Sequence, residues 1–216
     1  MIKVKFFLLS VLLVAVAVGD AIFVSNGLSG TITAQLINET SAGTKPRIQT
    51  MYPESMFDTN GSTMGNMIPY NNPSLGFSLE YPSDWQKDDS QPDAPTLISP
   101  PGGSGNMAPE IINIGTEVLP SSNFGLDSYT DAAIGQVQSF QDFRLLNSSS
   151  TTLGGLPAHM IVYTYTDEED QIPLQNLQAW TVKDGIAYII TYGGTPDEFD
   201  SSLPTLQSVM DSFRFE

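Results

Sequence analysis

The feature that most constrains the fold is a change of residue pattern near Asn71. Residues 25–70 are rich in Ser, Thr, Asn, Gly, Met and Pro and show no helical or strand period of useful length. Such a segment cannot bury enough apolar surface to offset the entropy lost on ordering, so we predict a flexible tether. From Asn71 onward short apolar and alternating runs recur, which predicts one folded domain over residues 71–216.

Strand patterns dominate this predicted domain. Gly76–Tyr81 alternates apolar and polar residues and stops at Pro82, as a strand entering a turn does. Ala158–Tyr165 also alternates. A two-residue Asp184-Gly185 turn between two apolar runs is a strong signal for a hairpin. The further predicted strands are Thr96–Ser99, Ile111–Leu119, Leu174–Val182 and Ile186–Tyr192.

Two segments carry helix signals. Ser128–Asp131 has the pattern of a capping box that opens a helix. Thr195 is a suitable N-cap before Pro196, and the apolar stripe that follows reaches Phe213. We expect Pro204 to kink this second helix or to split it in two. The order of elements predicts the α+β class, as an α/β/α sandwich with a central, mainly antiparallel sheet.

The amino terminus carries an export signal. Lys3 and Lys5 precede an uncharged stretch, Phe6–Gly19, and Ala17-Val18-Gly19 offers small residues for a signal peptidase. Residues 1–24 are therefore a signal peptide or, if uncleaved, an amino-terminal membrane anchor. In both cases we expect an extracytoplasmic protein, either secreted or tethered to the outer face of the membrane.

Composition excludes several classes of function. The 216 residues include 24 acidic and 8 basic side chains, for a net charge of −16, which speaks against binding nucleic acid. No cysteine is present, so disulfides and thiolate sites are excluded. His159 is the single histidine, which excludes zinc sites built from several imidazoles. The high charge has a simple alternative role, which is to keep an exported protein soluble.

The predicted domain resembles the PsbP family, which comprises the extrinsic photosystem II subunit and its relatives. Gly76–Trp85 (GFSLEYPSDW) is similar to the opening strand of that family. Trp180–Tyr188, Leu203-Pro204 and Asp211–Phe215 are similar to its closing stretch. The resemblance extends over about two thirds of the chain, from Tyr70 to the carboxyl end.

The resemblance implies the Mog1/PsbP-like fold and a non-enzymatic extrinsic subunit or assembly factor at the outer face of a membrane. It also implies that Phe77, Leu79, Tyr81 and Trp85 are core anchors and that Phe213 and Phe215 close the core. In the photosynthetic branch, members help photosystem II to retain calcium and chloride at its manganese cluster. This sequence departs from that branch because its leader resembles a plain secretion signal and its domain has few basic residues for docking. These departures speak against a photosynthetic role.

One acidic run is a candidate site for Ca²⁺ or Mn²⁺, because hard cations prefer several carboxylate oxygens. Consecutive side chains in a turn splay apart, so a solvated hairpin tip is the alternative interpretation. No other cofactor is expected. Three Asn-x-Ser/Thr sequons are candidate glycosylation sites in an exported chain. The acidic run is Asp167, Glu168, Glu169 and Asp170, and the sequons begin at Asn38, Asn60 and Asn147.

His159 lies in the middle of a predicted strand among apolar residues. A half-buried sheet histidine is the main interpretation, with a metal ligand or an acid–base group as alternatives. One histidine and no Gly-x-Ser-x-Gly elbow give no support to a catalytic triad. Three hypotheses follow. The first is an interaction module that binds a membrane protein complex or surface assembly. The others are an extracytoplasmic Ca²⁺ or Mn²⁺ binder and a small hydrolase.

Overall fold

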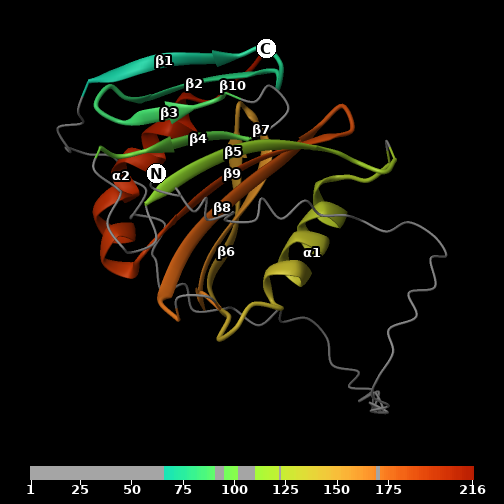
Figure 1. Cartoon of the computed structure of the whole chain (residues 1–216). Coiled ribbons are helices and arrows are strands. Elements are labelled where there is room, and N and C mark those ends of the chain that lie inside the picture. Colours follow the sequence, from blue (N-terminus) through green and yellow to red (C-terminus); the bar gives the residue numbers. More distant parts are fainter. Residues whose placement is uncertain (1–65, 91–94, 102–109, 122, 169–170) are drawn as a thin grey trace.

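The computed structural model describes residues 66–90, 95–101, 110–121, 123–168 and 171–216 (Figure 1). None of the helices in these ranges is long and apolar enough to cross a membrane. The elements in chain order are β1 (Met67–Asn72), β2 (Phe77–Pro82), β3 (Gln86–Asp88), β4 (Thr96–Ser99), β5 (Ile111–Val118), α1 (Leu126–Val137), β6 (Arg144–Leu153), β7 (Leu156–Thr166), β8 (Pro173–Lys183), β9 (Ile186–Gly194), α2 (Pro196–Ser212) and β10 (Arg214–Phe215).

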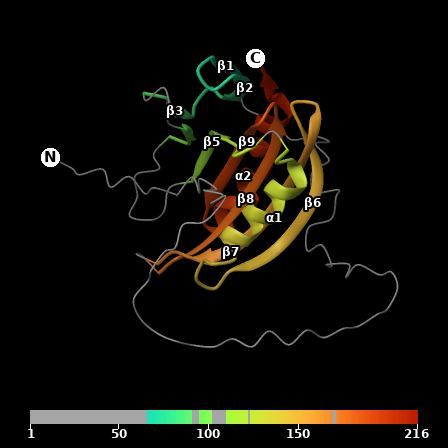
Figure 2. The ribbon, with the colours of Figure 1, turned by 90° about the vertical axis from the view of Figure 1, so that its right-hand side faces the viewer.

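A seven-stranded antiparallel sheet forms the centre of the domain, in the order β3-β4-β5-β9-β8-β7-β6. Successive side chains of a strand point to opposite faces, and each face carries its own apolar cluster. Tyr129 and Val137 of α1 are buried against Ile161 and Trp180 on one face. The stripe of α2 is buried on the other face (Figure 2). The predicted α+β sandwich with an antiparallel sheet between helices is confirmed.

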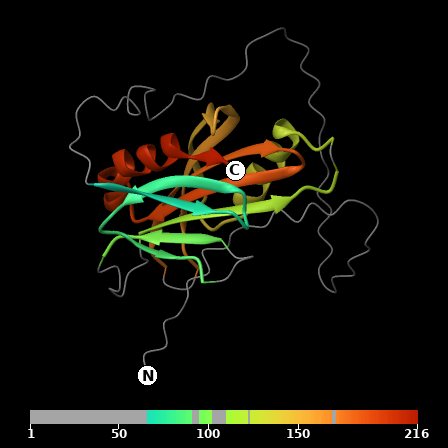
Figure 3. The same ribbon diagram turned by 90° about the horizontal axis from the view of Figure 1, so that it is seen from above.

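A second, three-stranded sheet in the order β1-β2-β10 shares the face covered by α2 (Figure 3). Phe77, Leu79 and Tyr81 point from β2 into the core. The ring of Phe213, between α2 and β10, stacks on Phe77 with centroids 5.6 Å apart. The carboxyl end of the chain thereby closes the core that β2 opens.

The start of α2 is as predicted. The Thr195 hydroxyl accepts from the backbone N–H of Glu198, whose carboxylate accepts from the Thr195 N–H at 2.8 Å. Of the two outcomes predicted at Pro204, the split does not occur, because α2 runs through this residue as one element. The kink stays a prediction. Leu203 and Leu206 lie on either side of the proline and are both buried, so packing against the sheet holds both halves of the helix.

The predicted start of α1 is wrong. The helix begins at Leu126 after Gly125, and no side chain caps it. The backbone N–H of Tyr129 already donates to the Gly125 carbonyl at 3.0 Å, so the first turn precedes the Ser128 capping pattern. Leu126 packs against the apolar cluster that lies between α1 and the sheet. This burial, and not a side-chain cap, sets the start of the helix.

The boundary predicted at Asn71 is too late, because Met67–Tyr70 already belong to β1. The strand contains Pro69 and does not alternate apolar and polar residues, which hid it in the sequence. It is held by antiparallel pairing with β2, from Met67 opposite Pro82 to Asn72 opposite Phe77. The predicted hairpin at Asp184-Gly185 is confirmed, since both residues have the positive φ that a two-residue turn requires.

Candidate functional site

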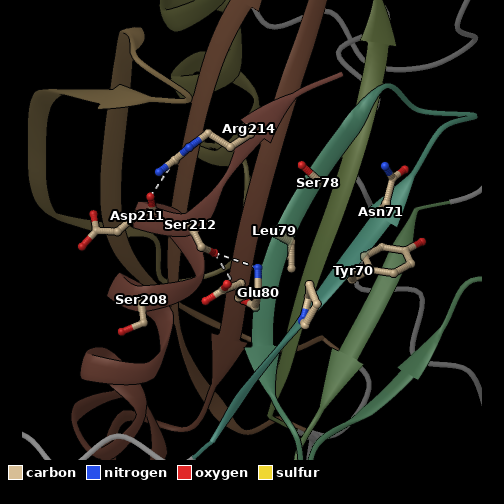
Figure 4. A pocket seen from close by; sticks show the side chains of 10 residues that line it. Tyr70, Asn71, Ser78, Leu79, Glu80, Ser208, Asp211, Ser212 and Arg214 are labelled. Carbon is tan, nitrogen blue, oxygen red and sulfur yellow. Dashed lines mark hydrogen bonds between the residues drawn. The ribbon is translucent and has the colours of Figure 1, made fainter.

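A groove of about 860 Å³ lies between the three-stranded sheet and the end of α2 (Figure 4). Strand alternation explains its polar floor. Phe77 and Leu79 are buried in the core, so Ser78 and Glu80 lie on the outer face of β2. The strand register sets Asn71 of β1 and Arg214 of β10 opposite Ser78, so an amide, a hydroxyl and a guanidinium lie in one row.

The last turn of α2 forms the wall of the groove. The Ser212 hydroxyl oxygen accepts a hydrogen bond from the backbone N–H of Glu80, at 2.8 Å. Arg214 Nη1 donates to the carbonyls of Asp211, at 2.8 Å, and Phe213, at 2.6 Å. A cation at this position satisfies orphan carbonyls and the negative end of the helix dipole.

Charge in the groove is mixed, with acidic groups in excess. The side chains of Glu80 and Asp211 are exposed carboxylates, and Arg214 is the one basic residue that the described part of the chain contributes to the lining. The Asp211 carboxylate accepts from Gln207 at 2.7 Å, which holds it at the end of the helix. Hydroxyl, amide and carboxylate groups of this kind can bind polar and basic groups of a partner, but they contain no activated nucleophile.

Tyr70 links this groove to the edge of the large sheet. Its hydroxyl donates to Asp89 at 2.9 Å and lies 3.2 Å from the Thr96 hydroxyl, while Lys87 sits over its ring. Burial is the main cause that raises the pKa of Tyr70. The hydrogen bond from Lys87 is the main cause that lowers the pKa of Asp89. These contacts order one side of the groove without creating a reactive group.

His159 lies on β7, on the face that α1 covers. Its Nε2 atom is 2.9 Å from the Ser148 hydroxyl of β6, and its ring packs at 5.6 Å from Trp180. Burial lowers the pKa of His159, while Asp127 of α1 acts in the opposite direction. No carboxylate among the described residues hydrogen-bonds the ring. The structure therefore shows His159 as a half-buried histidine of the sheet. Its hydrogen bond with Ser148 was not predicted from the sequence.

The candidate cation site falls partly outside the described residues, because Glu169 and Asp170 are not among them. Asp167 and Glu168 lie in the turn after β7. Gln171 donates from its backbone to the Asp167 carbonyl and from its side chain to the Glu168 carbonyl, both at 2.9 Å. Within the described ranges no three His, Asp or Glu side chains are grouped as a metal would require. Cation binding at this turn stays a prediction.

Of the three sequons, one lies in the described part of the chain. Asn38 and Asn60 lie outside the described residues. Asn147 lies in β6 with 3% of its surface exposed, and its side-chain oxygen is enclosed. A glycan on Asn147 would require that side chain to leave the interior.

Comparison with known proteins identifies the family. The sequence model of the family described as PsbP-like protein matches residues 22–215. The chain belongs to the PsbP-like family. Members of this family are generally non-enzymatic. The packing roles that the resemblance implied are confirmed in this PsbP-like chain. Phe77, Leu79, Tyr81 and Phe213 are buried in one cluster, and Trp85 and Phe215 are partly buried and pack against it.

Several solved structures are similar to this PsbP-like domain. Cyanobacterial PsbP (CyanoP) from Synechocystis sp. PCC 6803 is 16% identical, with a TM-score of 0.53, and the match covers 72% of this chain and 96% of that one. LpqN of Mycobacterium tuberculosis, described as involved in cell envelope biogenesis, is 15% identical with a TM-score of 0.53, covering 69% and 90%. The Ran-binding protein Mog1p of Saccharomyces cerevisiae is 9% identical with a TM-score of 0.49, covering 70% and 96%. No curated protein was found to match the sequence.

The groove residues of this PsbP-like chain were missed by sequence reasoning. Alternation along β2 contained part of the signal, because it puts Ser78 and Glu80 on the face opposite Phe77. Nothing in the sequence shows that Asp211 and Arg214 lie beside them, since that contact joins the two ends of the domain.

Proposed function

We propose that this chain is an exported, non-enzymatic interaction module that docks onto a membrane protein complex at the outer face of the membrane. In this proposal residues 1–24 direct export or anchor the chain, and the segment before β1 acts as a tether. Membership of the PsbP-like family supports the non-enzymatic part. A role in photosystem II is not part of the proposal.

The observation that carries the proposal is the groove between the small sheet and α2. Its floor and wall present exposed Glu80 and Asp211 among hydroxyl and amide groups, on a chain with a net charge of −16. Opposite charge on a partner would speed association and suppress the wrong partners. We therefore expect the docking partner to present a basic segment to this groove.

Other polar groups in the domain serve structural hydrogen bonds. The Tyr129 hydroxyl donates to Glu117 at 3.1 Å and the Tyr192 hydroxyl donates to Glu110 at 3.0 Å. Burial is the first cause that raises the pKa of both phenols, so neither is available as a phenolate. This use of polar groups favours a binding role over chemistry.

Photo-crosslinking on intact membranes tests the docking site. A benzophenone side chain at Ser78 of the full chain should capture the same membrane protein in repeated experiments. Glu80→Lys combined with Asp211→Lys should abolish this capture. Asp84→Lys combined with Asp131→Lys makes the same change of net charge at exposed positions outside the groove lining and should leave it intact. Equal capture by both double variants would contradict the proposed site.

The non-enzymatic part has a separate test at the Ser148–His159 pair. A fluorophosphonate probe labels serines that a neighbouring base activates. We expect no labelling of the full chain at Ser148, because no carboxylate among the described residues hydrogen-bonds His159. Labelling that is lost in Ser148→Ala would overturn this part and favour the hydrolase hypothesis.

A further inference from the structure

The strand β6 lies at one edge of the seven-stranded sheet, and its outer side has no partner strand among the described residues. β6 is the last strand in the sheet order and pairs with β7 alone, from Arg144 opposite Thr164 to Leu153 opposite Leu156 (Figure 2). No described strand lies beyond it, and no hydrogen bond among the described residues reaches its outer backbone. An edge of this kind can pair with another strand.

The two edges of the sheet differ in how they are protected. β3, at the opposite edge, carries Lys87 and Asp88 in a strand of three residues. Short charged edge strands discourage pairing. After Arg144, β6 contains neither charge nor proline, and its middle is a run of hydroxyl residues, Ser148–Thr152. Apart from Arg144 and the register shift between Leu145 and Asn147, nothing in β6 opposes the addition of a strand.

Charge also distinguishes this edge from the rest of the chain. No Asp, Glu, Lys or Arg occurs from Leu145 to Thr166, in a chain with a net charge of −16. Two copies of so acidic a protein repel each other over most of their surfaces. The β6–β7 hairpin is a place where they can approach without opposing like charges.

We propose that β6 pairs antiparallel with β6 of a second copy of this chain and joins two sheets into one. A two-fold axis at Ser150 sets Ser150 opposite itself and Ser148 opposite Thr152, so the hydroxyl run pairs with its own copy. Hydroxyl pairs across neighbouring strands are favourable. The register shift between Leu145 and Asn147 breaks the regular ladder and limits the pairing on that side.

The expected dimer is weak. Pairing of two short polar edges buries less than the ~1,200 Å² at which stable interfaces begin, so it depends on protein concentration. This proposal is independent of the docking groove, which lies over the other, smaller sheet. Failure of the dimerisation test therefore does not contradict the proposed docking function. Failure of the docking test likewise does not contradict dimerisation.

Sedimentation velocity of the full chain over a range of concentrations tests the pairing. Ser150→Glu sets two carboxylates opposite each other across the axis, and we expect dimerisation at least tenfold weaker than in the wild type. Gln86→Glu adds the same charge at the exposed start of β3, on the other edge, and should dimerise like the wild type. A monomeric wild type, or equal dimerisation of both variants, would overturn the proposal.

Cross-linking gives a second test, since the chain contains no cysteine. Under air oxidation, Ser150→Cys should form a disulfide-linked dimer, whereas Gln86→Cys should stay monomeric. Unchanged circular dichroism of each variant controls for folding. Equal cross-linking of the two variants, or none in Ser150→Cys, would contradict pairing through β6.

Discussion

The hydroxyl of Ser212 lies 2.8 Å from the backbone nitrogen of Glu80, on the edge of β2 that faces β10. β10 pairs with β2 only at Phe77 and Ser78. Further along, the side chain at the last turn of α2 takes the place of a strand. The same hydroxyl donates to the Val209 carbonyl at 2.8 Å, so Ser212 joins the helix end to the small sheet. This junction forms the wall of the groove.

Replacing Ser212 by Ala should destabilise the domain by about 0.5–1.5 kcal/mol, the usual net value of one hydrogen bond. The Glu80 N–H is accessible to water, so the larger effect should be faster hydrogen exchange at that amide. Ser212→Thr keeps the hydroxyl and serves as the control. Unchanged exchange at Glu80 in Ser212→Ala would show that the bond does not hold this edge.

Gly154, in the β6–β7 turn, should not tolerate a side chain. Its φ is +58°, and a Cβ atom would lie 2.5 Å from Cε2 of Phe215. Gly155 also has a positive φ, but nothing lies within 4 Å of its Cβ position. We expect Gly154→Ala to cost about 1–3 kcal/mol more than Gly155→Ala, because overpacking adds to the strain that both share. Urea unfolding of both variants measures the difference, and equal losses would contradict this contact.

Thr195→Ala should lower the free energy of unfolding by about 1 kcal/mol, with an expected range of ~0.5–2 kcal/mol. The change removes the hydroxyl that accepts from the Glu198 N–H and that donates to the Glu198 carboxylate at 2.8 Å. Thr195→Ser keeps both bonds and should retain most of the stability. Urea unfolding is the measurement. A loss in Thr195→Ser as large as in Thr195→Ala would indicate that the methyl group, not the cap, matters.

His159 should make stability depend on pH. Burial lowers its pKa in the folded state below the ordinary value of 6.5, so the unfolded state binds the proton more tightly. Its stabilising contribution is complete above pH 6.5 and is lost as the pH falls through the lowered folded pKa. Between about pH 7.5 and about pH 5, the wild type should therefore lose more stability than His159→Gln.

Urea unfolding at several pH values compares the two chains, and the shared carboxylates cancel in the difference. The imidazole proton resonance of His159 provides a direct check, because it should titrate below pH 6.5. Titration at or above that value would mean that Asp127 outweighs burial.

Local patterns were enough to predict much of the fold. The turn at Asp184-Gly185 and the cap at Thr195 are signals within a few residues, and both are confirmed. The strand that alternation predicted over Ala158–Tyr165 is confirmed as part of β7. The helix start expected at Ser128 and the split expected at Pro204 are wrong for one reason. In both helices burial against the sheet decided the outcome over a local signal.

The candidate sites could be predicted less well, because they depend on contacts between distant segments. His159 was correctly expected to be half-buried, but its bond to Ser148 follows from the pairing of β6 with β7. The groove joins strands at the start of the domain to Asp211 and Arg214 at its end.

The sequence by itself determined the α+β class and the likeness to the PsbP-like family, because periodicity and short packing motifs are local properties. Tertiary structure alone decided where β1 begins, how α2 passes through Pro204 and which side chains meet in the groove. Pairing and burial draw their free energy from segments far apart in the chain, so no local window of sequence contains it. Tertiary structure also decided that β6 lies at an edge with no described strand beyond it, because an edge depends on the order of the strands in the sheet.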